Sequence, residues 1–456
     1  MTKAEQPKQD MGTGSVKKLM VKMAVPALVG QVVNLLYNVV DRIYIGHIPE
    51  IGGLALTGVG LFTPILMLIT ASAMLSGAGG APRAAIAMGQ GDKNTAEKIM
   101  GNCFTVLLLL AVLLTTVFYF AAPTLLRLFG ASDATLPYAV EYGRIYILGS
   151  VSVLIVMGMN TFITTQGFAS MSMLTTVIGA GINIILDPIF IHGKFGVPAM
   201  GVAGAAVATV IGQWIGAALC IYMNVKHNPD VMLKLKYLKP RKETLSPILA
   251  VGIPALIMNS IGSVMNFGMN QIFQGFQETA TGVFGIYYKL QSFFFKPLFG
   301  INNATISIIA YNYGARRPER MTKTLKIACA TAFCFMLAGL AAFQLLPDML
   351  LNLFNPSEEF MSMGVMALRI ISIHFPVAAF CIMLGASFQA LGNGIYSTIV
   401  SLCRQLFVLL PVAYLLSLTG NVNNVWWSFP IAEVVSAAVT FTLFRRLYLN
   451  KIKPLF

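Results

Sequence analysis

The chain has 456 residues, of which 57% are hydrophobic and only 11% are charged, and its formal net charge is +14. Soluble globular proteins carry about 25% charged residues, so this composition excludes a soluble globular fold. Apolar runs long enough to cross a hydrocarbon core of about 30 Å as helices recur along the whole chain, and they lack the alternating pattern of outer-membrane barrel strands. We therefore expect an all-α integral membrane protein.

The chain begins with the polar segment "MTKAEQPKQDMGTGSVKK", which we interpret as a cytosolic tail rather than a signal peptide. From there, hydropathy predicts a multi-pass protein of the cytoplasmic membrane with both termini in the cytosol. The predicted spans begin near residues 19, 55, 98, 136, 171, 201, 246, 279, 322, 360, 395 and 425. Twelve transmembrane helices are therefore expected.

The positive charge is concentrated in segments that this topology places in the cytosol. Besides the N-terminal tail, these segments are "PRAAIAMGQGDKNTAEK", "KHNPDVMLKLKYLKPRKE", "GARRPERMTKTLK" and "RRLYLNKIK". That distribution follows the positive-inside rule, so we expect a lipid bilayer and not nucleic acid as the partner of these cations. The six cysteines form no CxxC or Cys/His pattern, so we expect neither a disulfide framework nor a zinc site, and no cofactor.

The two halves of the chain resemble one another. Four pairs of short segments match in order, at offsets of between 223 and 228 residues: "AVPAL" with "GIPAL", "GQGDK" with "NYGAR", "LLRLFGAS" with "LLNLFNPS", and "TTQGFAS" with "SFQALGN". Six spans per half make the repeats parallel, a pattern typical of transporters with a binding site between the repeats. We predict an N-lobe over residues 1–225, a cytosolic basic linker over 226–245 and a C-lobe over 246–456.

Polar residues follow one face of the first span. Gln31, Asn34, Asn38 and Asp41 are spaced by three, four and three residues, which places them on one side of a helix. The seventh span repeats the pattern with Asn259, Ser263, Asn266 and Asn270. A side-chain amide in hydrocarbon needs a partner, so both faces are expected to meet either a wet cavity or neighbouring helices through interhelical hydrogen bonds.

Asp41 carries the stronger functional signal, because a charge at bilayer depth costs at least about 2.5–3.5 kcal/mol. The fifth span carries Asn183 and Asp187 one turn apart, and Thr209 on the sixth span falls at a comparable depth. We predict that these four side chains converge in the N-lobe as an ion-coupling site.

Two neighbouring carboxyl groups out of water can take up and release a proton as their surroundings change. The same oxygens of Asp41, Asn183, Asp187 and Thr209 could hold Na⁺, and the sequence does not choose between the two ions. A structural alternative is that Asp187, which directly precedes Pro188, caps a helix end or pairs with Arg42.

Several motifs together resemble the multidrug and toxic compound extrusion (MATE) transporters. They are "PALVGQVVNLLYNVVDRIYIG", "NIILDPIFI", "GVAGAAVATVIGQ" and "FGINNATISIIAYNYGA", and the resemblance covers essentially the whole chain. It implies two six-helix lobes that form a V around a central cavity. It also implies export of organic cations in exchange for H⁺ or Na⁺.

The family's coupling residues fall on positions already selected by their spacing. Its first-span acid falls on Asp41, its fifth-span amide and acid on Asn183 and Asp187, and its sixth-span threonine on Thr209. Pro26 matches the proline about which the first span is thought to bend when its acid is protonated. The alternative is a fixed kink, since proline removes a helical hydrogen bond in any case.

One departure concerns the second lobe, where other branches of the family place carboxylates on the seventh and tenth spans. Here the corresponding spans offer only amides, namely Asn266, Asn270, Gln274 and Gln389. A cation site of that kind is therefore not expected. Arg404 and Glu433, on the last two spans, are expected to pair with each other.

Soft and aromatic side chains suit a cavity that accepts many shapes. The residues predicted to line it are Tyr37, Met67, Met157, Met265, Asn266, Asn270 and Lys289. Lys289 has an alternative, since a lysine can extend to the interface or pair locally.

We expect a monomeric antiporter of small organic cations. The alternative function is a flippase for lipid-linked saccharides of the same superfamily, which would need a cationic cavity. Lys289, Lys296 and Arg369 are compatible with it, and the paired acids oppose it. An enzyme is not expected, because neither an HExxH motif nor a nucleophile with a placed base occurs in the sequence. A passive channel is a further alternative.

Overall fold

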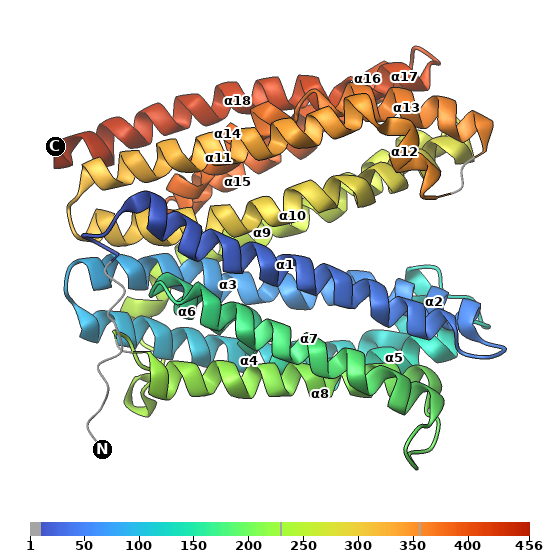
Figure 1. The fold of residues 1–456 in the computed structure, drawn as a ribbon, viewed down its shortest axis with the longest axis horizontal. Helices are drawn as coiled ribbons and strands as arrows, with labels where there is room; N and C mark the ends of the chain where they lie inside the picture. Colours follow the sequence, from blue (N-terminus) through green and yellow to red (C-terminus); the bar gives the residue numbers. More distant parts are fainter. Residues whose placement is uncertain (1–10, 229, 355–356) are drawn as a thin grey trace.

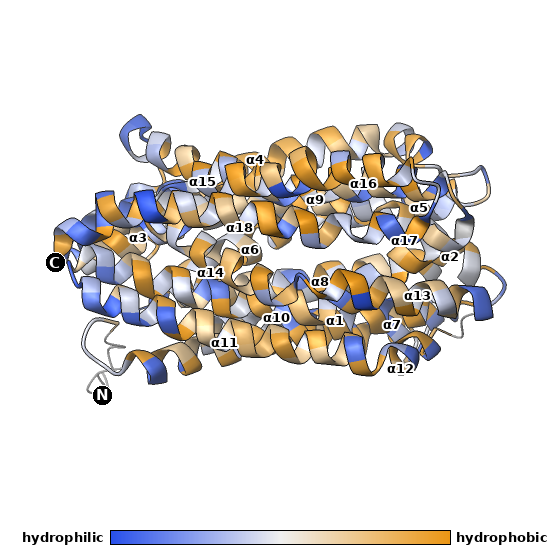
Figure 2. Ribbon diagram, turned by 90° about the horizontal axis from the view of Figure 1, so that it is seen from above, coloured by the Kyte–Doolittle hydropathy of each residue, from blue (hydrophilic) through white to orange (hydrophobic). Residues whose placement is uncertain are grey.

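The computed structural model describes residues 11–228, 230–354 and 357–456, and all secondary structure in these residues is helical. Residues 1–10 of the predicted tail and residue 229 of the predicted linker lie outside the described residues. Figure 2 shows hydrophilic residues gathered at the two ends of the bundle and hydrophobic residues along its length. That distribution is expected for helices that cross a bilayer.

The helices divide between two halves of the chain. The N-terminal half contains α1 (Val16–Gly46), α2 (Gly52–Leu61), α3 (Thr63–Gly89), α4 (Lys93–Leu128), α5 (Leu136–Leu148), α6 (Ser150–Thr165), α7 (Ala169–His192), α8 (Gly201–Tyr222) and η1 (Met223–His227). The C-terminal half, with the segment that leads to it, contains η2 (Leu235–Tyr237), α9 (Lys242–Gln274), α10 (Glu278–Gly314), α11 (Pro318–Leu345), α12 (Pro347–Asn352), α13 (Glu358–Ser372), α14 (Phe375–Ala390), α15 (Gly394–Leu402), η3 (Cys403–Leu409), α16 (Leu410–Ser417), α17 (Val422–Trp426), α18 (Ser428–Leu447), η4 (Tyr448–Ile452) and η5 (Lys453–Leu455).

The prediction of twelve spans is confirmed. In the described part of the chain, ten helical segments are long and apolar enough to cross a membrane, and two bent pairs bring the number to twelve. The bent pairs are α5 with α6, at 53°, and α13 with α14, at 45°. The largest shift in a start is at the third span, expected near residue 98 and found at Lys93, because the helix continues beyond its apolar stretch into a polar first turn.

The two halves form the arms of a V. In Figure 1 the N-terminal half (blue to green) and the C-terminal half (yellow to red) lie close together at the end that holds the C-terminus and the start of α1. We call this the terminus end. The halves diverge toward the opposite end, here the far end, where α2, α5, α12 and α17 lie.

Glycines bring the two halves into backbone contact at the terminus end. α3 packs against both α9 and α10 of the other half. A Cβ atom on Gly314 would lie 2.0 Å from the carbonyl oxygen of Ile86, and one on Gly252 would lie 2.1 Å from that of Leu75. Small residues allow helices to approach this closely in a membrane, so the seam is built for direct backbone packing.

The start of α1 packs into the C-terminal half, although α1 continues into the N-terminal half. Met20 and Met23 are buried in the hydrophobic core of the C-terminal half. Arg320, on α11, donates hydrogen bonds to the backbone oxygens of Gly14 (2.6 Å) and Met11 (3.1 Å). Helix α1 therefore connects the cores of both halves.

The predicted basic linker is held against the N-terminal half along most of its described length. Lys234 Nζ donates to the buried carboxylate of Glu97 at 2.6 Å. The side chain of Asn102 accepts a hydrogen bond from the Arg241 backbone N–H (2.8 Å) and donates one to the Tyr237 carbonyl (3.1 Å). Because α9 begins at Lys242, the two halves are joined at a short stretch around Arg241.

The backbone contact at the seam predicts that replacing one of its glycines with alanine destabilises the protein. Gly252→Ala would place its Cβ within 2.1 Å of a carbonyl oxygen, so α3 and α9 must separate, and overpacking of this kind costs about 1–3 kcal/mol. We expect a lower midpoint of thermal unfolding in detergent. The control is Gly285→Ala on α10, where a Cβ meets nothing within 4 Å and alanine should raise the midpoint slightly. Equal midpoints for the two variants would contradict direct backbone packing at the seam.

Candidate functional site

Two aspartates are buried among the helices of the N-terminal half. Asp41, near the far end of α1, has 7% of its surface exposed, and Asp187 on α7 has none. Helices α1 and α7 pack against each other, and the two carboxylates are near enough for their charges to interact. Asn183 on α7 and Thr209 on α8 are also buried.

The close approach of α7 and α8 decides which side chains surround Asp187. A Cβ on Gly212 would lie 2.5 Å from the carbonyl oxygen of Gly179, so the helix backbones touch there. Beside this contact, Asn183 Nδ2 donates to Asp187 Oδ1 (3.1 Å) and to Thr209 Oγ1 (3.2 Å). The amide therefore links the acid to the hydroxyl of the neighbouring helix.

The cluster contains three buried oxygens with no hydrogen-bond partner: Asp41 Oδ1, Asn183 Oδ1 and Asp187 Oδ2. Most buried polar atoms in proteins are hydrogen-bonded, and these atoms can only accept unless a carboxyl is protonated. The arrangement therefore suits a proton or a small cation.

Neither aspartate is neutralised by a basic side chain. The three ion pairs found in residues 11–228, 230–354 and 357–456 include neither Asp41 nor Asp187. Arg42 acts electrostatically on Asp41, but its own side chain is exposed. A structural pairing of Asp187 with Arg42 is absent from these described residues.

Three residues near the acids were missed by the sequence analysis. Gln213 Nε2 donates to Tyr146 Oη at 3.0 Å, and Tyr142 lies close enough to both aspartates for their charges to act on it. The spacing of these residues in the sequence could have identified them. Gln213 lies one turn beyond Thr209, and Tyr142 and Tyr146 lie one turn apart on α5. Tyr37, predicted as cavity lining, belongs to the same electrostatic neighbourhood.

The polar face of α1 is partly satisfied within the helix itself. Asn38 is exposed, and its Nδ2 donates to the Asn34 backbone oxygen at 2.6 Å. Gln31 and Asn34 are half-buried, and α1 continues as a helix through Pro26.

The predicted cavity residues have different environments. Met67 (51% exposed) accepts a hydrogen bond from Ser263 across the seam between α3 and α9, at 3.6 Å. The other residues of this group that the structure leaves partly or largely exposed are Tyr37, Met157, Asn266, Asn270 and Lys289.

The prediction that Met265 lines the cavity is wrong, because its side chain is only 7% exposed and packs in the core of the C-terminal half. It shares the inward face of α9 with Met269, one turn away, whereas Asn266 is rotated off that face and bonds to the Gly262 carbonyl. Adjacent residues on a helix point about 100° apart, so burial of Met265 in the core leaves Asn266 partly exposed.

Comparison with known proteins identifies the family. The MatE family model matches residues 26–189 and 254–415, one segment in each half. The chain belongs to the MatE family. The resemblance to MATE transporters expected from the sequence is therefore confirmed, and so is the fold of two six-helix repeats.

Relatives of this MatE protein include a protein named "Multidrug export protein MepA" from Staphylococcus haemolyticus, 24% identical over 96% of each chain. A solved structure of a multidrug resistance MATE family transporter in an outward-facing conformation has a TM-score of 0.88 and 29% identity over 97% of each chain. A Pyrococcus furiosus transporter of the MOP superfamily, described as having a binding pocket of reversed polarity that suggests a different function, has a TM-score of 0.89 and 28% identity over 99% of each chain.

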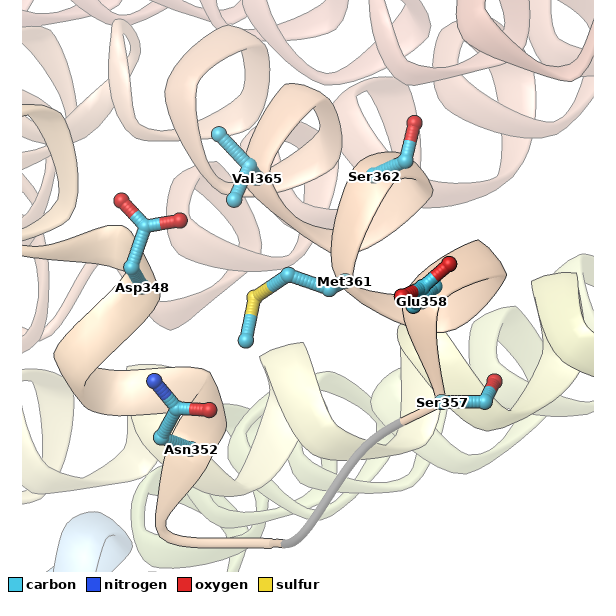
Figure 3. Close-up of a pocket in the computed structure, with 7 residues that line it drawn as sticks. All are labelled: Asp348, Asn352, Ser357, Glu358, Met361, Ser362 and Val365. Atoms are coloured by element: carbon cyan, nitrogen blue, oxygen red, sulfur yellow. The ribbon is translucent and has the colours of Figure 1, made fainter.

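A pocket of about 530 Å³ lies elsewhere in this MatE protein, between α12 and the start of α13 (Figure 3). It lies at the far end, and its carboxylates, from Asp348 and Glu358, belong to exposed residues. It contains none of the predicted site residues, so we keep the candidate site at the buried aspartates.

In the C-terminal half, the predicted pairing of Arg404 with Glu433 is confirmed. Arg404 Nη1 lies 3.6 Å from Glu433 Oε2, and the Glu433 side chain is 4% exposed. Arg404 belongs to the π-helical segment η3, and η3 packs against α18. The buried carboxylate of Glu433 is thus compensated by a basic side chain.

This ion pair predicts a double-mutant cycle. Arg404→Met alone leaves the buried carboxylate of Glu433 without its partner, a change that costs about 3–5 kcal/mol, and we expect a strongly lowered midpoint of thermal unfolding. The double variant, with Glu433→Met added, removes both charges and should recover most of the loss. If the double variant is as unstable as the sum of the two single variants, the pair does not act as a unit.

Proposed function

We propose that this protein is a secondary active antiporter that exports amphipathic organic cations in exchange for H⁺ or Na⁺. Its coupling site would be Asp41, Asn183, Asp187 and Thr209. The observation that carries the proposal is the set of buried acceptor oxygens on Asp41, Asn183 and Asp187 that lack a hydrogen-bond partner. A carboxylate that is kept away from water and has no ion-pair partner among the described residues is ready to bind a cation.

The family and the names of the relatives support the transport of drug-like compounds. Membership of the MatE family and similarity to proteins named multidrug export proteins favour small-molecule efflux over catalysis. In the proposed orientation the terminus end faces the cytosol, because the clusters of lysine and arginine lie there. The arms of the V would then be open toward the outside.

Exchange follows from competition for the same charge. A proton or Na⁺ bound at Asp41 and Asp187 neutralises the cluster, and so does a cationic substrate, so binding of one weakens binding of the other. A positive charge that moves inward releases about 2.3 kcal/mol per 100 mV, and a monovalent cationic substrate that moves outward costs the same amount. A one-for-one exchange is therefore driven by the concentration gradient of the coupling ion, at about 1.4 kcal/mol per tenfold gradient. Asn183 and Thr209 would hold Asp187 in position while its charge changes.

The buried carboxylates of Asp41 and Asp187 also help to distinguish antiport from the alternative function. A flippase for lipid-linked saccharides would have to hold a diphosphate, which two uncompensated carboxylates repel. The buried cluster therefore favours cationic cargo.

The coupling role predicts the effect of removing one charge. Asp41→Asn keeps the size and polarity of the side chain but cannot exchange a proton, so we expect dye efflux to fall at least about tenfold. Asp187→Asn should behave alike. Efflux of a cationic dye is measured from cells that express equal amounts of each variant, with thermal unfolding as a check on folding.

The matched control is Asp133→Asn, which removes an acid whose side chain is 94% exposed. Its efflux should equal that of the unchanged protein. Normal efflux in a folded Asp41→Asn variant would refute the assignment of the coupling site.

The identity of the coupling ion is tested in proteoliposomes. A pH gradient and a Na⁺ gradient are imposed separately, and movement of a cationic dye is followed together with that of an anionic dye. We expect at least one gradient to drive the cationic dye uphill, with no effect on the anionic dye. Dye flux that ignores both gradients would indicate a passive pathway and contradict antiport.

A further inference from the structure

Two cationic side chains from different halves of the molecule reach the same loop at the terminus end. Arg83 lies on α3 of the N-terminal half, and Lys451 lies in η4 near the C-terminus. Their positive charges act on one another. Neither belongs to any of the three ion pairs in the part of the chain that the structure describes, so this pair of cations has no carboxylate to balance it.

Both side chains converge on the loop between α14 and α15. Lys451 Nζ donates to the Leu391 carbonyl and to Asn393 Oδ1, each at 2.8 Å. The guanidinium of Arg83 crosses the seam to the same loop, where its Nη2 lies 3.6 Å from the position of a Cβ on Gly392. Arg83 Nε is buried and has no hydrogen-bond partner.

The loop leads directly into the first turn of α15, which adds further donors. Asn393 is the residue before this helix, and its side chain makes no capping hydrogen bond, because its Oδ1 accepts from Lys451 instead. The first backbone N–H groups of a helix lack partners within the helix and carry a partial positive charge. A guanidinium with an unpartnered Nε, an ammonium group with one N–H left after its two hydrogen bonds, and a helix amino end thus lie at the same loop. An anion can accept from all three.

We propose that Arg83, Lys451 and the amino end of α15 form a binding site for a phosphate-type oxyanion that bridges the two halves at the terminus end. Guanidinium groups bind two phosphate oxygens at once, and lysine adds a point charge. The bound anion removes the repulsion between the two cations and provides an acceptor for Arg83 Nε. Since Arg83 and Lys451 belong to different halves, the anion ties those halves together where they already touch.

The same chemistry is available from an anionic lipid headgroup and from free phosphate. Ile395 and Ile399, one turn apart on α15, are exposed apolar side chains, and they offer a path for an acyl chain beside the site. The experiment separates the two sources.

The test is thermal unfolding of the full-length protein in detergent with phosphatidylcholine as background lipid. Either phosphatidylglycerol or inorganic phosphate is titrated in at constant ionic strength. The variants are Arg83→Gln with Lys451→Gln, and the control Lys453→Gln, which removes an exposed charge from the same tail. We expect the anion to raise the unfolding midpoint of the unchanged protein and of the control, and to bind at least about tenfold more weakly to the double variant.

A shift with phosphatidylglycerol alone identifies a lipid site, and a shift with both ligands identifies a site for phosphate itself. The absence of a shift in the unchanged protein, or an equal shift in the double variant, overturns the proposal. Should the double variant not fold, native mass spectrometry of the unchanged protein and of Arg83→Lys decides. Retention of phosphatidylglycerol that is weakened by Arg83→Lys supports the site, and equal or absent retention rejects it.

Discussion

The structure depends on how the oxygens of Asp41 and Asp187 are accommodated away from water. A buried acceptor without a partner is costly in a medium that offers no solvent, so the packing around these atoms determines what the N-terminal half can bind. The contact between Gly179 and Gly212 brings α7 and α8 together and places Asn183 between Asp187 and Thr209. The amide satisfies one oxygen of Asp187 and leaves the other available. A backbone contact thus sets the chemistry of the site.

The two halves share one fold but differ in the pairing of Asp41 and Asp187 on the one side and Glu433 on the other. In the N-terminal half Asp41 and Asp187 take part in none of the ion pairs of the described residues, whereas in the C-terminal half Glu433 is compensated by Arg404 at 3.6 Å. A compensated carboxylate has little reason to take up another cation. The repeat therefore supplies two similar scaffolds, and the distribution of arginine decides which of them is left electrostatically open.

The sequence predicted most of the fold and the members of the candidate site, because both depend on patterns along single helices. Hydropathy located the twelve spans, and spacing along α1 and α7 selected Asp41, Asn183 and Asp187. The prediction from the sequence was wrong for Met265, because which side chains face the core depends on how the helix is rotated about its axis. The sequence also could not show that residues 11–23 pack in the C-terminal half, since apolar side chains do not encode their partner. Arg83 was counted only as part of the cytosolic charge, and its place at the seam requires the loop at Gly392.

Helix α1 contacts both halves of the molecule and therefore connects the seam at the terminus end to the buried Asp41. Its start is fixed in the core of the C-terminal half by Met20 and Met23 and by hydrogen bonds from Arg320. Near its other end, Asp41 lies buried beside α7. If the angle between the halves changes, α1 must bend between these anchors or one anchor must break. Pro26 lies in that interval, where the helix lacks one backbone hydrogen bond and resists bending least. We propose that a change in the opening of the V would reach the surroundings of Asp41 through this one continuous helix.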